Sequence, residues 1–466
     1  MTTFSAHAKT LMAISPARKI AFEVLRRVES EGAFASDLLH EDLGASVRRE
    51  DAALATEISL GVLRRRRLLD FLLAHHLKKS LERLDLPVLL ALRIGLYQLL
   101  YLEKIPARAA VNESVELVKR AQKSSAATLV NAVLRRASES TAAPVEKLIP
   151  PETRLAERLG ILHSHPTWMV ERWLRRFGEA RTVGLLEADN RPPRLSCVLH
   201  DAGHRAEIFQ SLTASGIRLE DGALLRDAFS VSGGSPTRTA AFRVGQISIQ
   251  DEASQAVPLL LGVREGHRVL DLCAAPGGKT APLVRAAGAN GMVVAADRHA
   301  HRLRSMQDQF RRLRLACANL VELDATCPLP FGAVFQKILI DAPCTGTGTL
   351  ARHPEIRWRL APENLRELHS LQLSILLSAI EQLAPGGRIV YSTCSLEKEE
   401  NEDMVKAALA QSPGLCLASR ETVAHELQPY LASVVDPLSL VDSEGQFRTF
   451  PGEQPCDGFF AAVLEK

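Results

Sequence analysis

Two cysteines follow short apolar runs, in polar surroundings that favour chemistry over core packing. Cys344 lies in Asp341-Ala-Pro-Cys-Thr-Gly-Thr-Gly348, and Cys394 lies in Ser392-Thr-Cys-Ser395. A free thiol is most often a small, buried apolar group. The neighbouring Thr and Ser residues favour instead two loops that face a ligand, where a thiolate could act as a nucleophile.

A third segment has the composition of a ligand-binding loop, Asp271-Leu-Cys-Ala-Ala-Pro-Gly-Gly-Lys-Thr280. Gly277 and Gly278 allow the backbone to turn sharply and to approach a ligand closely. Lys279 and Thr280 open the next predicted helix, whose N-terminus carries free N–H groups and a partial positive charge.

Three cofactors could use such a loop. A phosphate loop requires G-x-x-x-x-G-K-[ST], but Cys273 stands where its first glycine belongs. A nicotinamide cofactor requires G-x-G-x-x-G; Gly346-Thr-Gly348 begins one, but it ends on Ala351 and follows the fourth predicted strand. S-adenosylmethionine requires an acidic residue after the second strand, for the ribose hydroxyls, and a polar residue after the third, for adenine. Asp297 and Asp324 stand at those two places, so the pattern favours S-adenosylmethionine.

The elements that must position these residues begin near residue 246, where strands and helices alternate. Strands are predicted at Arg268–Leu272, Met292–Ala296, Leu320–Leu323, Lys337–Ile340 and Arg388–Tyr391. Helices are predicted at Thr280–Ala287, His301–Leu313 and Pro362–Leu383. This order predicts a doubly wound parallel sheet, which binds ligands beyond the carboxyl ends of its strands. The glycine loop, the aspartates and both cysteines fall at those ends.

Residues 14–138, by contrast, predict helices throughout. Amphipathic stretches run over Ala17–Val28, Asp51–Leu63, Leu68–Leu77, Leu86–Leu102, Ala109–Ala121 and Ala126–Ala137. The prolines of Thr141–Pro151 indicate a linker. After it we predict a helix at Thr167–Phe177, strands at Leu195–Leu199 and Ile217–Leu219, and a helix at Ala206–Ala214. We therefore expect an all-α domain over residues 1–143, a linker and small α+β domain over 144–245, and an α/β domain over 246–466.

The charge of the chain is unevenly distributed. The whole chain has a net charge of +3, but residues 1–150 carry 23 Lys and Arg against 17 Asp and Glu, which is a net +6. This part includes the run Arg64, Arg65, Arg66 and Arg67. A basic run can follow RNA phosphates without reading sequence, although it can equally be a solvated helix face. We predict that these four arginines contact RNA.

Several other classes of protein are not expected. The eight cysteines form no C-x-x-C pair and no other metal spacing stands out, so we expect no metal site. The N-terminus lacks the pattern of a signal peptide, and Arg93 interrupts the longest apolar run, Leu86–Leu102. These features predict a cytoplasmic protein with reduced thiols and no membrane span. We expect a monomer.

A thiol beside a methyl donor suits one acceptor in particular. Cytosine C5 is a poor nucleophile, but addition of a thiolate to C6 makes the ring enamine-like, so that C5 can attack a sulfonium methyl group. A base then removes the C5 proton and the thiolate leaves. Asp341 is placed to act near N3 of the base, whereas an N-methyltransferase has no use for such a thiol. Spacing alone leaves open whether Cys344 or Cys394 attacks.

These motifs closely resemble those of the RNA cytosine-C5 methyltransferases. The resemblance extends to Gln250-Asp-Glu-Ala-Ser254, Arg352-His-Pro-Glu-Ile-Arg-Trp358 and Asp457-Gly-Phe-Phe460, and covers residues 246–466. It implies that Cys394 is the nucleophile and that Cys344 assists product release. It also implies that Asp341 and Lys279 belong to the catalytic residues, with Lys279 directed toward the target base. It also implies that the cofactor and base site is lined by Cys273, Ala274, Ala275, Pro276, Gly277, Gly278, Lys279, Asp297, Asp324 and Asp341.

The N-terminal helices resemble the NusB antitermination fold, through Ala17-Arg-Lys-Ile-Ala-Phe-Glu-Val-Leu25, Ala109-Ala-Val-Asn-Glu-Ser-Val115 and Val130-Asn-Ala-Val-Leu-Arg135. A NusB-like domain before such a catalytic domain is similar to the bacterial 16S rRNA methyltransferases of the RsmB (Sun/Fmu) type, which implies cytosine 967 as the target. One departure is Val198-Leu-His200, where relatives often carry Arg-x-Asn.

We therefore predict S-adenosylmethionine-dependent C5 methylation of a cytosine in 16S rRNA or a small-subunit precursor. The fold is predicted as a NusB-like all-α domain, a small α+β domain and a Rossmann-like class I methyltransferase domain. Alternatives are another rRNA or tRNA cytosine, a non-catalytic RNA-binding assembly factor, and an ATP-dependent enzyme that uses the near-phosphate loop.

Overall fold

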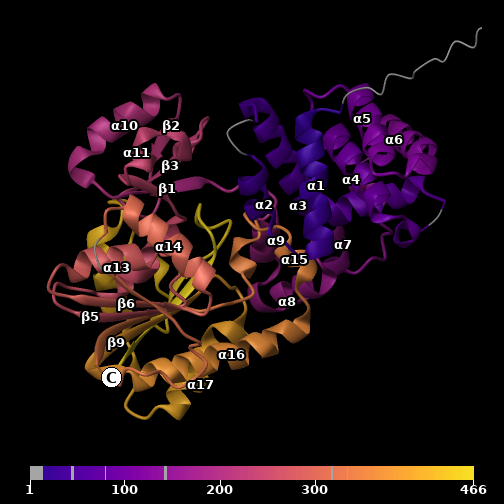
Figure 1. Cartoon of the computed structure of the whole chain (residues 1–466). Coiled ribbons are helices and arrows are strands. Elements are labelled where there is room, and N and C mark those ends of the chain that lie inside the picture. The colour runs from indigo at the N-terminus through magenta and orange to yellow at the C-terminus, as the bar shows by residue number, and fades with distance from the viewer. Residues whose placement is uncertain (1–13, 44–46, 79, 141–143, 316–317, 333) are drawn as a thin grey trace, which may run out of the picture. The chain divides into compact units, whose positions relative to one another are not determined.

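A computed structural model describes the chain apart from residues 1–13, 44–46, 79, 141–143, 316–317 and 333 (Figure 1). The described residues form two compact units, between which the chain passes three times. The first comprises residues up to Arg191 together with Leu350–Arg359. The second comprises Pro192–Thr349 and Leu360–Lys466. This division differs from the predicted domain boundaries, because the helices that follow the linker belong to the first unit.

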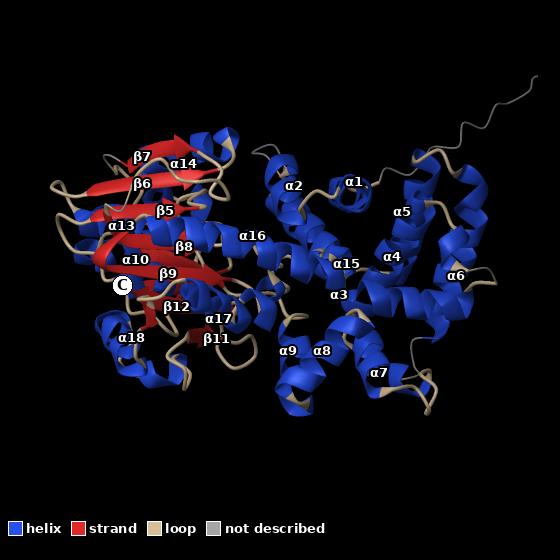
Figure 2. Cartoon of the chain, turned by 90° about the horizontal axis from the view of Figure 1, so that it is seen from below, coloured by secondary structure: helices blue, strands red, loops and turns tan. Residues whose placement is uncertain are grey.

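The described part of the first unit is helical (Figure 2). Its helices are α1 (Pro16–Glu31), α2 (Ala35–Asp42), α3 (Arg49–His76), α4 (Leu86–Tyr101), α5 (Ala107–Arg120), α6 (Ala127–Ser140), α7 (Leu155–Leu162), α8 (Thr167–Phe177), α9 (Glu179–Ala188) and α15 (Ile356–Arg359). Helix α4 is apolar on nearly every side and contacts α1, α3, α5 and α6. A helix without a polar face is a core helix, so α1, α3, α5 and α6 pack around it.

Helix α3 differs from the prediction. The sequence pattern places a break between Leu63 and Leu68, whereas α3 runs without interruption over Arg49–His76. The four arginines between the two apolar stretches hide the periodicity, but arginine has a high helix propensity and does not end a helix. The prediction of two separate helices was therefore wrong.

The second unit contains a small sheet and a large one. The small sheet has the order β2-β3-β1-β4, with every pairing antiparallel. Its strands are β1 (Leu195–Leu199), β2 (Arg218–Asp221), β3 (Ala228–Ser232) and β4 (Ile247–Ile249), accompanied by α10 (Arg205–Ala214) and α11 (Ala240–Arg243). We predicted β1, β2 and α10. Strand β4 was missed because it has only three residues, and β3 was missed although its Phe-Ser-Val-Ser segment alternates apolar and polar residues.

The large sheet has the order β10-β12-β9-β8-β5-β6-β7, with β11 paired to β12. Its strands are β5 (Arg268–Leu272), β6 (Met292–Asp297), β7 (Ala318–Glu322), β8 (Phe335–Asp341), β9 (Leu383–Thr393), β10 (Cys416–Leu417), β11 (Phe447–Thr449) and β12 (Phe459–Glu465). Strands β5 to β9 are parallel, and β12 is antiparallel to β9. The predicted parallel sheet is confirmed, with an antiparallel edge added by the C-terminal strands.

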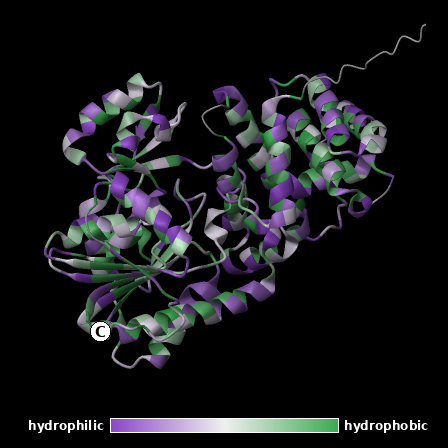
Figure 3. Ribbon diagram, viewed as in Figure 1, coloured by the Kyte–Doolittle hydropathy of each residue, from purple (hydrophilic) through white to green (hydrophobic). Residues whose placement is uncertain are grey.

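The helices of this unit are α12 (Glu252–Ala256), α13 (Thr280–Ala287), α14 (Ala300–Arg312), α16 (Pro362–Glu381), α17 (Glu402–Gln411) and α18 (Arg420–Leu427). Helices α13 and α14 cover one face of the sheet, and α16 and α17 cover the other (Figure 1). The strands are apolar on both faces, as expected for a covered parallel sheet (Figure 3). For example, Val269 packs with α13 and α14 whereas Leu270 packs with α16 and α17.

The order of the strands decides where a ligand can bind. After β5 the chain passes to β6 and β7 on one side, and it then returns to β8 on the other side of β5. A crevice forms at the carboxyl ends of the strands where the order reverses in this way. The site is therefore expected at the ends of β5 and β8.

The segment Leu350–Arg359, which follows β8, folds into the first unit. Arg357 is fully buried there, and its guanidinium donates hydrogen bonds to the carbonyl oxygens of Ser164, Asp189 and Leu350 and to the side chain of Asn190. Burial lowers the pKa of Arg357 to about 10, so it stays charged at neutral pH. This arginine anchors the segment through the carbonyl groups.

Candidate active site

The glycine loop joins the end of β5 to the start of α13. Asp271 is buried at the end of β5 and accepts a hydrogen bond from the hydroxyl of Thr280 at 2.6 Å. Its Oδ1 has no hydrogen-bond partner among the described residues. Burial raises the pKa of Asp271 to about 7. Burial and the nearby carboxylates raise the pKa of the Cys273 thiol, which therefore stays protonated at neutral pH.

Gly277 is required by the geometry of this loop. Its φ is +99°, and a Cβ at this position would lie 2.8 Å from Met306 and 2.9 Å from Phe310. Only glycine adopts such a conformation without strain. The loop therefore depends on the absence of a side chain, as the sequence predicts.

Asp297 lies at the end of β6, next to the glycine loop. Its carboxylate accepts hydrogen bonds from the backbone N–H of Ala275 at 3.3 Å and of His299 at 3.0 Å, and it pairs with Arg302 at 3.1 Å. The same arginine donates to the carbonyl of Ala275. Asp297 is thus held rigidly against the loop, although several of its acceptor positions are already in use.

Asp324 lies two residues beyond β7 and is half-buried. Hydrogen bonds from Thr326 hold the pKa of its carboxyl below the usual range, and Arg298 lies 3.4 Å away. A carboxylate that stays ionised and half-exposed can accept hydrogen bonds from a ligand.

Lys279 and Asp341 form an ion pair at the edge of the sheet. Lys279 Nζ lies 2.7 Å from Asp341 Oδ2, and the hydroxyl of Ser392 donates to Oδ1 of the same carboxylate at 3.1 Å. The ammonium group also lies 5.0 Å from the centre of the Phe459 ring. These contacts bring together the loop after β5, the end of β8 and the end of β9.

The two cysteines predicted to be catalytic lie side by side. The Sγ atoms of Cys344 and Cys394 are 3.4 Å apart, and neither residue is fully buried. The hydrogen bond between the two thiols, together with burial, raises the pKa of Cys344 well above its usual range. Cys344 therefore keeps its proton and can donate it towards Cys394.

The two cysteine-bearing loops are also joined through their backbones. The N–H of Gly348 donates to the carbonyl of Cys394 at 2.9 Å, and the N–H of Gly458 donates to the carbonyl of Gly348 at 2.8 Å. A Cβ at Gly348 would lie 2.1 Å from the Gly458 carbonyl oxygen, so this close approach requires glycine. Gly458 belongs to Asp457-Gly-Phe-Phe460, one of the segments that resemble motifs of the RNA cytosine-C5 methyltransferases.

Two residues beneath these loops were missed by sequence analysis. Glu400 and Asn401 are fully buried and bond to both cysteine loops. Their only signal in the sequence is the acidic run Glu397-Lys-Glu-Glu-Asn401 shortly after Cys394, which is typical of an exposed helix start.

The residues at this edge fit S-adenosylmethionine better than a polyphosphate. Carboxylates stand at or just beyond the ends of four neighbouring strands, at Asp271, Asp297, Asp324 and Asp341. Lys279, the cation of the loop, is already paired. Carboxylates repel phosphates, whereas they accept hydrogen bonds from the ammonium and ribose hydroxyl groups of S-adenosylmethionine. The donor set therefore argues against the phosphate-loop alternative.

The four arginines predicted to contact RNA are used within the first unit. Arg64 is only 4% exposed and donates to the carbonyl of Ala351. Arg67 donates to the carbonyl of His165 and the hydroxyl of Thr167. Arg65 stacks over Tyr101, and Arg66 stacks over Trp358 and pairs with Glu29.

This placement corrects the expectation for Arg64, whereas contact of the half-buried Arg65, Arg66 and Arg67 with RNA stays a prediction. Successive residues of a helix point about 100° apart, so four arginines in a row surround the helix and do not form one surface. Because α3 is packed on several sides, the guanidinium groups meet carbonyls and rings. Arg64 in particular is too buried to reach an RNA phosphate.

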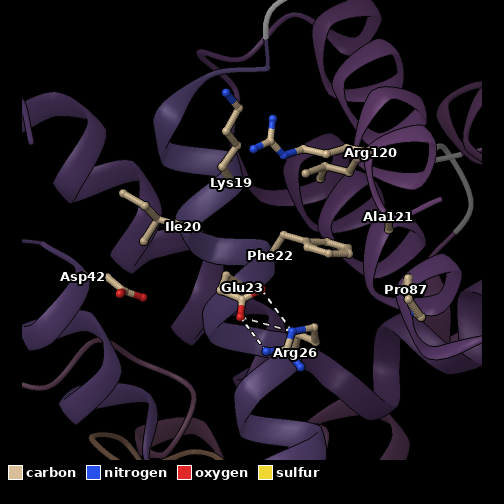
Figure 4. Close-up of a pocket in the computed structure, with 10 residues that line it drawn as sticks. Lys19, Ile20, Phe22, Glu23, Arg26, Asp42, Pro87, Arg120 and Ala121 are labelled. Carbon is tan, nitrogen blue, oxygen red and sulfur yellow. Dashed lines mark hydrogen bonds and ion pairs between the residues drawn. The ribbon is translucent and has the colours of Figure 1, made fainter.

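The first unit also holds a cavity of about 580 Å³, lined by residues of α1, α2, α4 and α5 (Figure 4). Phe22 lies at its centre in this view, and Glu23 pairs with Arg26. Lys19 and Arg120 also line the cavity, and neither side chain has a polar partner among the described residues.

The described residues hold neither a metal site nor a membrane-spanning helix. No set of three or more His, Cys, Asp or Glu side chains there could hold a metal ion. None of the described helices is both long and apolar enough to span a membrane.

Known proteins match this chain along most of its length. The family model described as 16S rRNA methyltransferase RsmB/F matches residues 258–465, and the NusB family model matches residues 15–139. A ferredoxin-like domain of RsmF/B-like methyltransferases matches residues 165–238. A probable ribosomal RNA small subunit methyltransferase B of Bacillus subtilis is 30% identical over 458 residues, which is 96% of this chain and 98% of the relative. The chain belongs to the RsmB/F family of 16S rRNA methyltransferases.

Other members of the RsmB/F family and solved structures agree. Ribosomal RNA small subunit methyltransferase B of Pseudomonas putida is 35% identical over 396 residues, covering 82% of this chain and 87% of the relative. The crystal structure of PH0851 has a TM-score of 0.79 at 25% identity and covers 98% of this chain and 100% of its own. A methyltransferase homologue from Pyrococcus horikoshii has a TM-score of 0.54 at 27% identity, covering 68% of this chain and 100% of its own. The predicted family is confirmed, as is the predicted fold of a NusB-like domain, a small α+β domain and a Rossmann-like domain. The match adds that the middle domain is ferredoxin-like.

Proposed function

We propose that this member of the RsmB/F family methylates C5 of a cytosine in 16S rRNA, with S-adenosylmethionine as methyl donor and Cys394 as nucleophile. The observation that carries the proposal is the pair of thiols, with sulfurs 3.4 Å apart, at the sheet edge that also holds the Lys279–Asp341 ion pair. A methyltransferase that acts on a nitrogen or a hydroxyl has no need for two thiols at this place.

The methyl donor would be held by the glycine loop, Cys273 to Lys279, and by Asp297, Asp324 and Asp341. Asp297 suits the ribose hydroxyls, because its carboxylate is held against the loop by Arg302. Asp324 suits the adenine edge. When bound there, S-adenosylmethionine supplies an electrophilic methyl group on a sulfonium sulfur.

The protein residues divide the remaining chemistry among them. The Cys394 thiolate adds to C6 of the cytosine, which forms an S–C6 bond and places the electron pair at C5. Asp341 acts near N3, where a proton neutralises the charge that develops on the ring. After methylation a base removes the C5 proton, and the returning electron pair breaks the S–C6 bond. Cys344 keeps its proton, so it can stabilise the departing Cys394 thiolate by a hydrogen bond.

Mutation of the two cysteines tests the mechanism. Cys394→Ala is expected to abolish methyl transfer while S-adenosylmethionine still binds. Cys344→Ala is expected to accumulate a covalent protein–RNA adduct, detected as a slow band in denaturing gels, because the adduct forms but is not released. An adduct in the Cys394 variant and none in the Cys344 variant would show that the roles are reversed. Tight binding of Mg-ATP, measured by calorimetry, would argue against S-adenosylmethionine as the cofactor.

We propose cytosine 967 of 16S rRNA as the target, on the strength of the family resemblance. Bisulfite sequencing of rRNA from a deletion strain tests it, since cytosine 967 should become unmethylated. An unchanged 16S pattern would contradict this target and leave another rRNA cytosine or a tRNA cytosine. If the wild-type chain transferred no methyl group to any RNA, it would act as a non-catalytic assembly factor.

We further infer that the first unit contributes to RNA binding through the cavity described above. Lys19 and Arg120 line it without polar partners among the described residues, together with the half-buried Phe22 (Figure 4). Free cations suit phosphates, and an aromatic ring suits an unstacked base. We propose that the protein acts as a cytoplasmic monomer on free 16S rRNA or on a small-subunit precursor.

A further inference from the structure

A single buried carboxylate joins the two cysteine-bearing loops. Glu400 is 0% exposed. Its Oε1 accepts hydrogen bonds from the backbone N–H of Thr345 at 2.9 Å and from Nε2 of Gln372 at 2.9 Å. Its Oε2 accepts from the hydroxyl of Thr345 at 2.5 Å and from the hydroxyl of Ser395. Thr345 directly follows Cys344, and Ser395 directly follows Cys394.

The same short turn fixes the second loop from below. Asn401 accepts from the hydroxyl of Thr393 at 2.6 Å and donates to the carbonyl of Ser395 at 2.8 Å. The hydroxyl of Tyr391 donates to the carbonyl of Glu400 at 2.8 Å. The residues on both sides of Cys394 are therefore tied to Glu400 and Asn401, and Cys344 is tied to them through Thr345.

We propose that Glu400 is a positioning residue that sets the separation of the Cys344 and Cys394 thiols. It touches neither thiol, but it holds the residue after each cysteine on one carboxylate. The catalytic importance of this spacing rests on the proposed function, because the spacing matters only if one thiol attacks the cytosine and the other assists release of the product. The spacing itself can be measured without any reaction.

The length of the Glu400 side chain matters more than its charge. Two of its four partners, the Thr345 N–H and the NH2 group of Gln372, can only donate, and both meet Oε1. The other two are hydroxyl groups at Oε2, and a hydroxyl can also accept. In Glu400→Gln the amide oxygen can keep the first two bonds, and the new NH2 group can donate to the hydroxyls. Glu400→Asp keeps the charge but is one methylene too short to reach both loops.

Phenylarsine oxide provides a direct probe of thiol spacing. Its arsenic(III) centre forms two As–S bonds with two neighbouring thiols and releases the oxygen as water, so tight binding requires both sulfurs within reach. Peptide mapping by mass spectrometry identifies which cysteines are bridged. Cys344→Ala and Cys394→Ala each remove one sulfur, so they show how tightly the arsenical binds when no bridge between the two thiols can form.

Glu400→Asp is expected to weaken bridging of Cys344 and Cys394 by about tenfold or more, the effect expected from the loss of one hydrogen bond to a charged group. Glu400→Gln should stay within about fivefold of the parent protein, since neutral hydrogen bonds replace charge-assisted ones. The matched control is Glu252→Asp, which shortens another buried glutamate of the same unit. Glu252 accepts hydrogen bonds from the backbone N–H groups of Ala223, Leu224 and Leu225 and touches neither loop.

Three outcomes would overturn the proposal. Parent-like bridging in Glu400→Asp would show that the loops hold their spacing without this residue. Equal losses in Glu252→Asp would show that shortening a buried glutamate disturbs the whole unit. Greater loss in Glu400→Gln than in Glu400→Asp would show that charge decides the spacing.

The same variants separate this inference from the proposed function. Glu400→Asp should bind S-adenosylmethionine as the parent does, with a reduced kcat and an unchanged KM for RNA, and Glu400→Gln should restore kcat. If the parent protein methylated no cytosine, the proposed function would fail, yet the bridging measurements would still decide whether Glu400 sets the thiol spacing.

Discussion

Substitution of Gly277 by alanine tests the geometry of the cofactor loop most directly. Gly277 has φ +99°, where an L residue is strained, and the added Cβ would lie 2.8 Å from Met306 Cγ and 2.9 Å from a ring carbon of Phe310. The backbone strain costs about 1–2 kcal/mol, and overpacking against buried side chains adds about 1–3 kcal/mol. We expect a loss of about 3 kcal/mol of unfolding free energy, which lowers Tm by about 6–12 °C for a domain of this size.

The neighbouring glycine is a matched control. A Cβ at Gly278 would meet only the side-chain end of Gln250, at 3.3 Å. That amide can move aside, so Gly278→Ala should cost less than about 1 kcal/mol. Urea denaturation followed by circular dichroism measures both stabilities, and calorimetry measures S-adenosylmethionine binding. Equal stability losses in the two variants would refute the assignment of strain to Gly277. If Gly277→Ala bound S-adenosylmethionine as tightly as the parent protein, the turn at Gly277 would not be needed for cofactor binding.

Two further predictions follow from buried charge and from free cations. Burial raises the pKa of Asp271 to about 7, whereas the pKa of an aspartate in the unfolded chain is about 4. The contribution of Asp271 to the free energy of unfolding is therefore fully present below about pH 4 and is lost as the pH rises through about 7. Asp271→Asn should remove up to about 4 kcal/mol of this pH dependence. Urea denaturation between pH 4 and 8 measures it, and parallel curves of unfolding free energy against pH for the parent and the variant would contradict the prediction. The double variant Lys19→Glu and Arg120→Glu should weaken RNA binding and reduce the slope of log affinity against log salt by about 1 per lost phosphate contact. Two variants serve as controls: Lys147→Glu makes the same kind of charge change at an exposed residue of the same unit, and Arg64→Ala removes a buried arginine. If the salt slope changed as much in either control as in the double variant, Lys19 and Arg120 would not be the residues that contact RNA.

Local signals were enough to predict much of the methyltransferase domain. Helix α13 has the predicted bounds, Thr280–Ala287, because a glycine turn marks its start and another glycine follows its end. The strands β5 and β6 were predicted because both are short apolar runs bounded by turn residues. Apolar runs in a strand–helix order determine a covered parallel sheet, and parallel strands bring their carboxyl ends to one edge. The aspartates and the two cysteines were assigned to that edge from order alone.

Elements without such signals were missed or mistaken. Strand β4 is too short to show a period, and α3 was predicted to break where its arginines interrupt the apolar pattern. The run Arg64–Arg67 suggested an exposed basic patch, but Arg64 is buried against Ala351, which is 287 residues away along the chain. A sequence shows charge, but it does not show what packs against that charge.

The sequence by itself determined the family, the order of the domains and the residue types of the site, because these depend on local patterns and on motif order. Only the tertiary structure decided which side chains meet. It placed Cys344 and Cys394, fifty residues apart in the chain, with their sulfurs 3.4 Å from each other. It also buried Glu400 beneath both loops, where an acidic run near a helix start suggested only an exposed surface. Contacts between distant segments are decided by packing and by the pairing of buried polar groups, and these act only once the chain has folded.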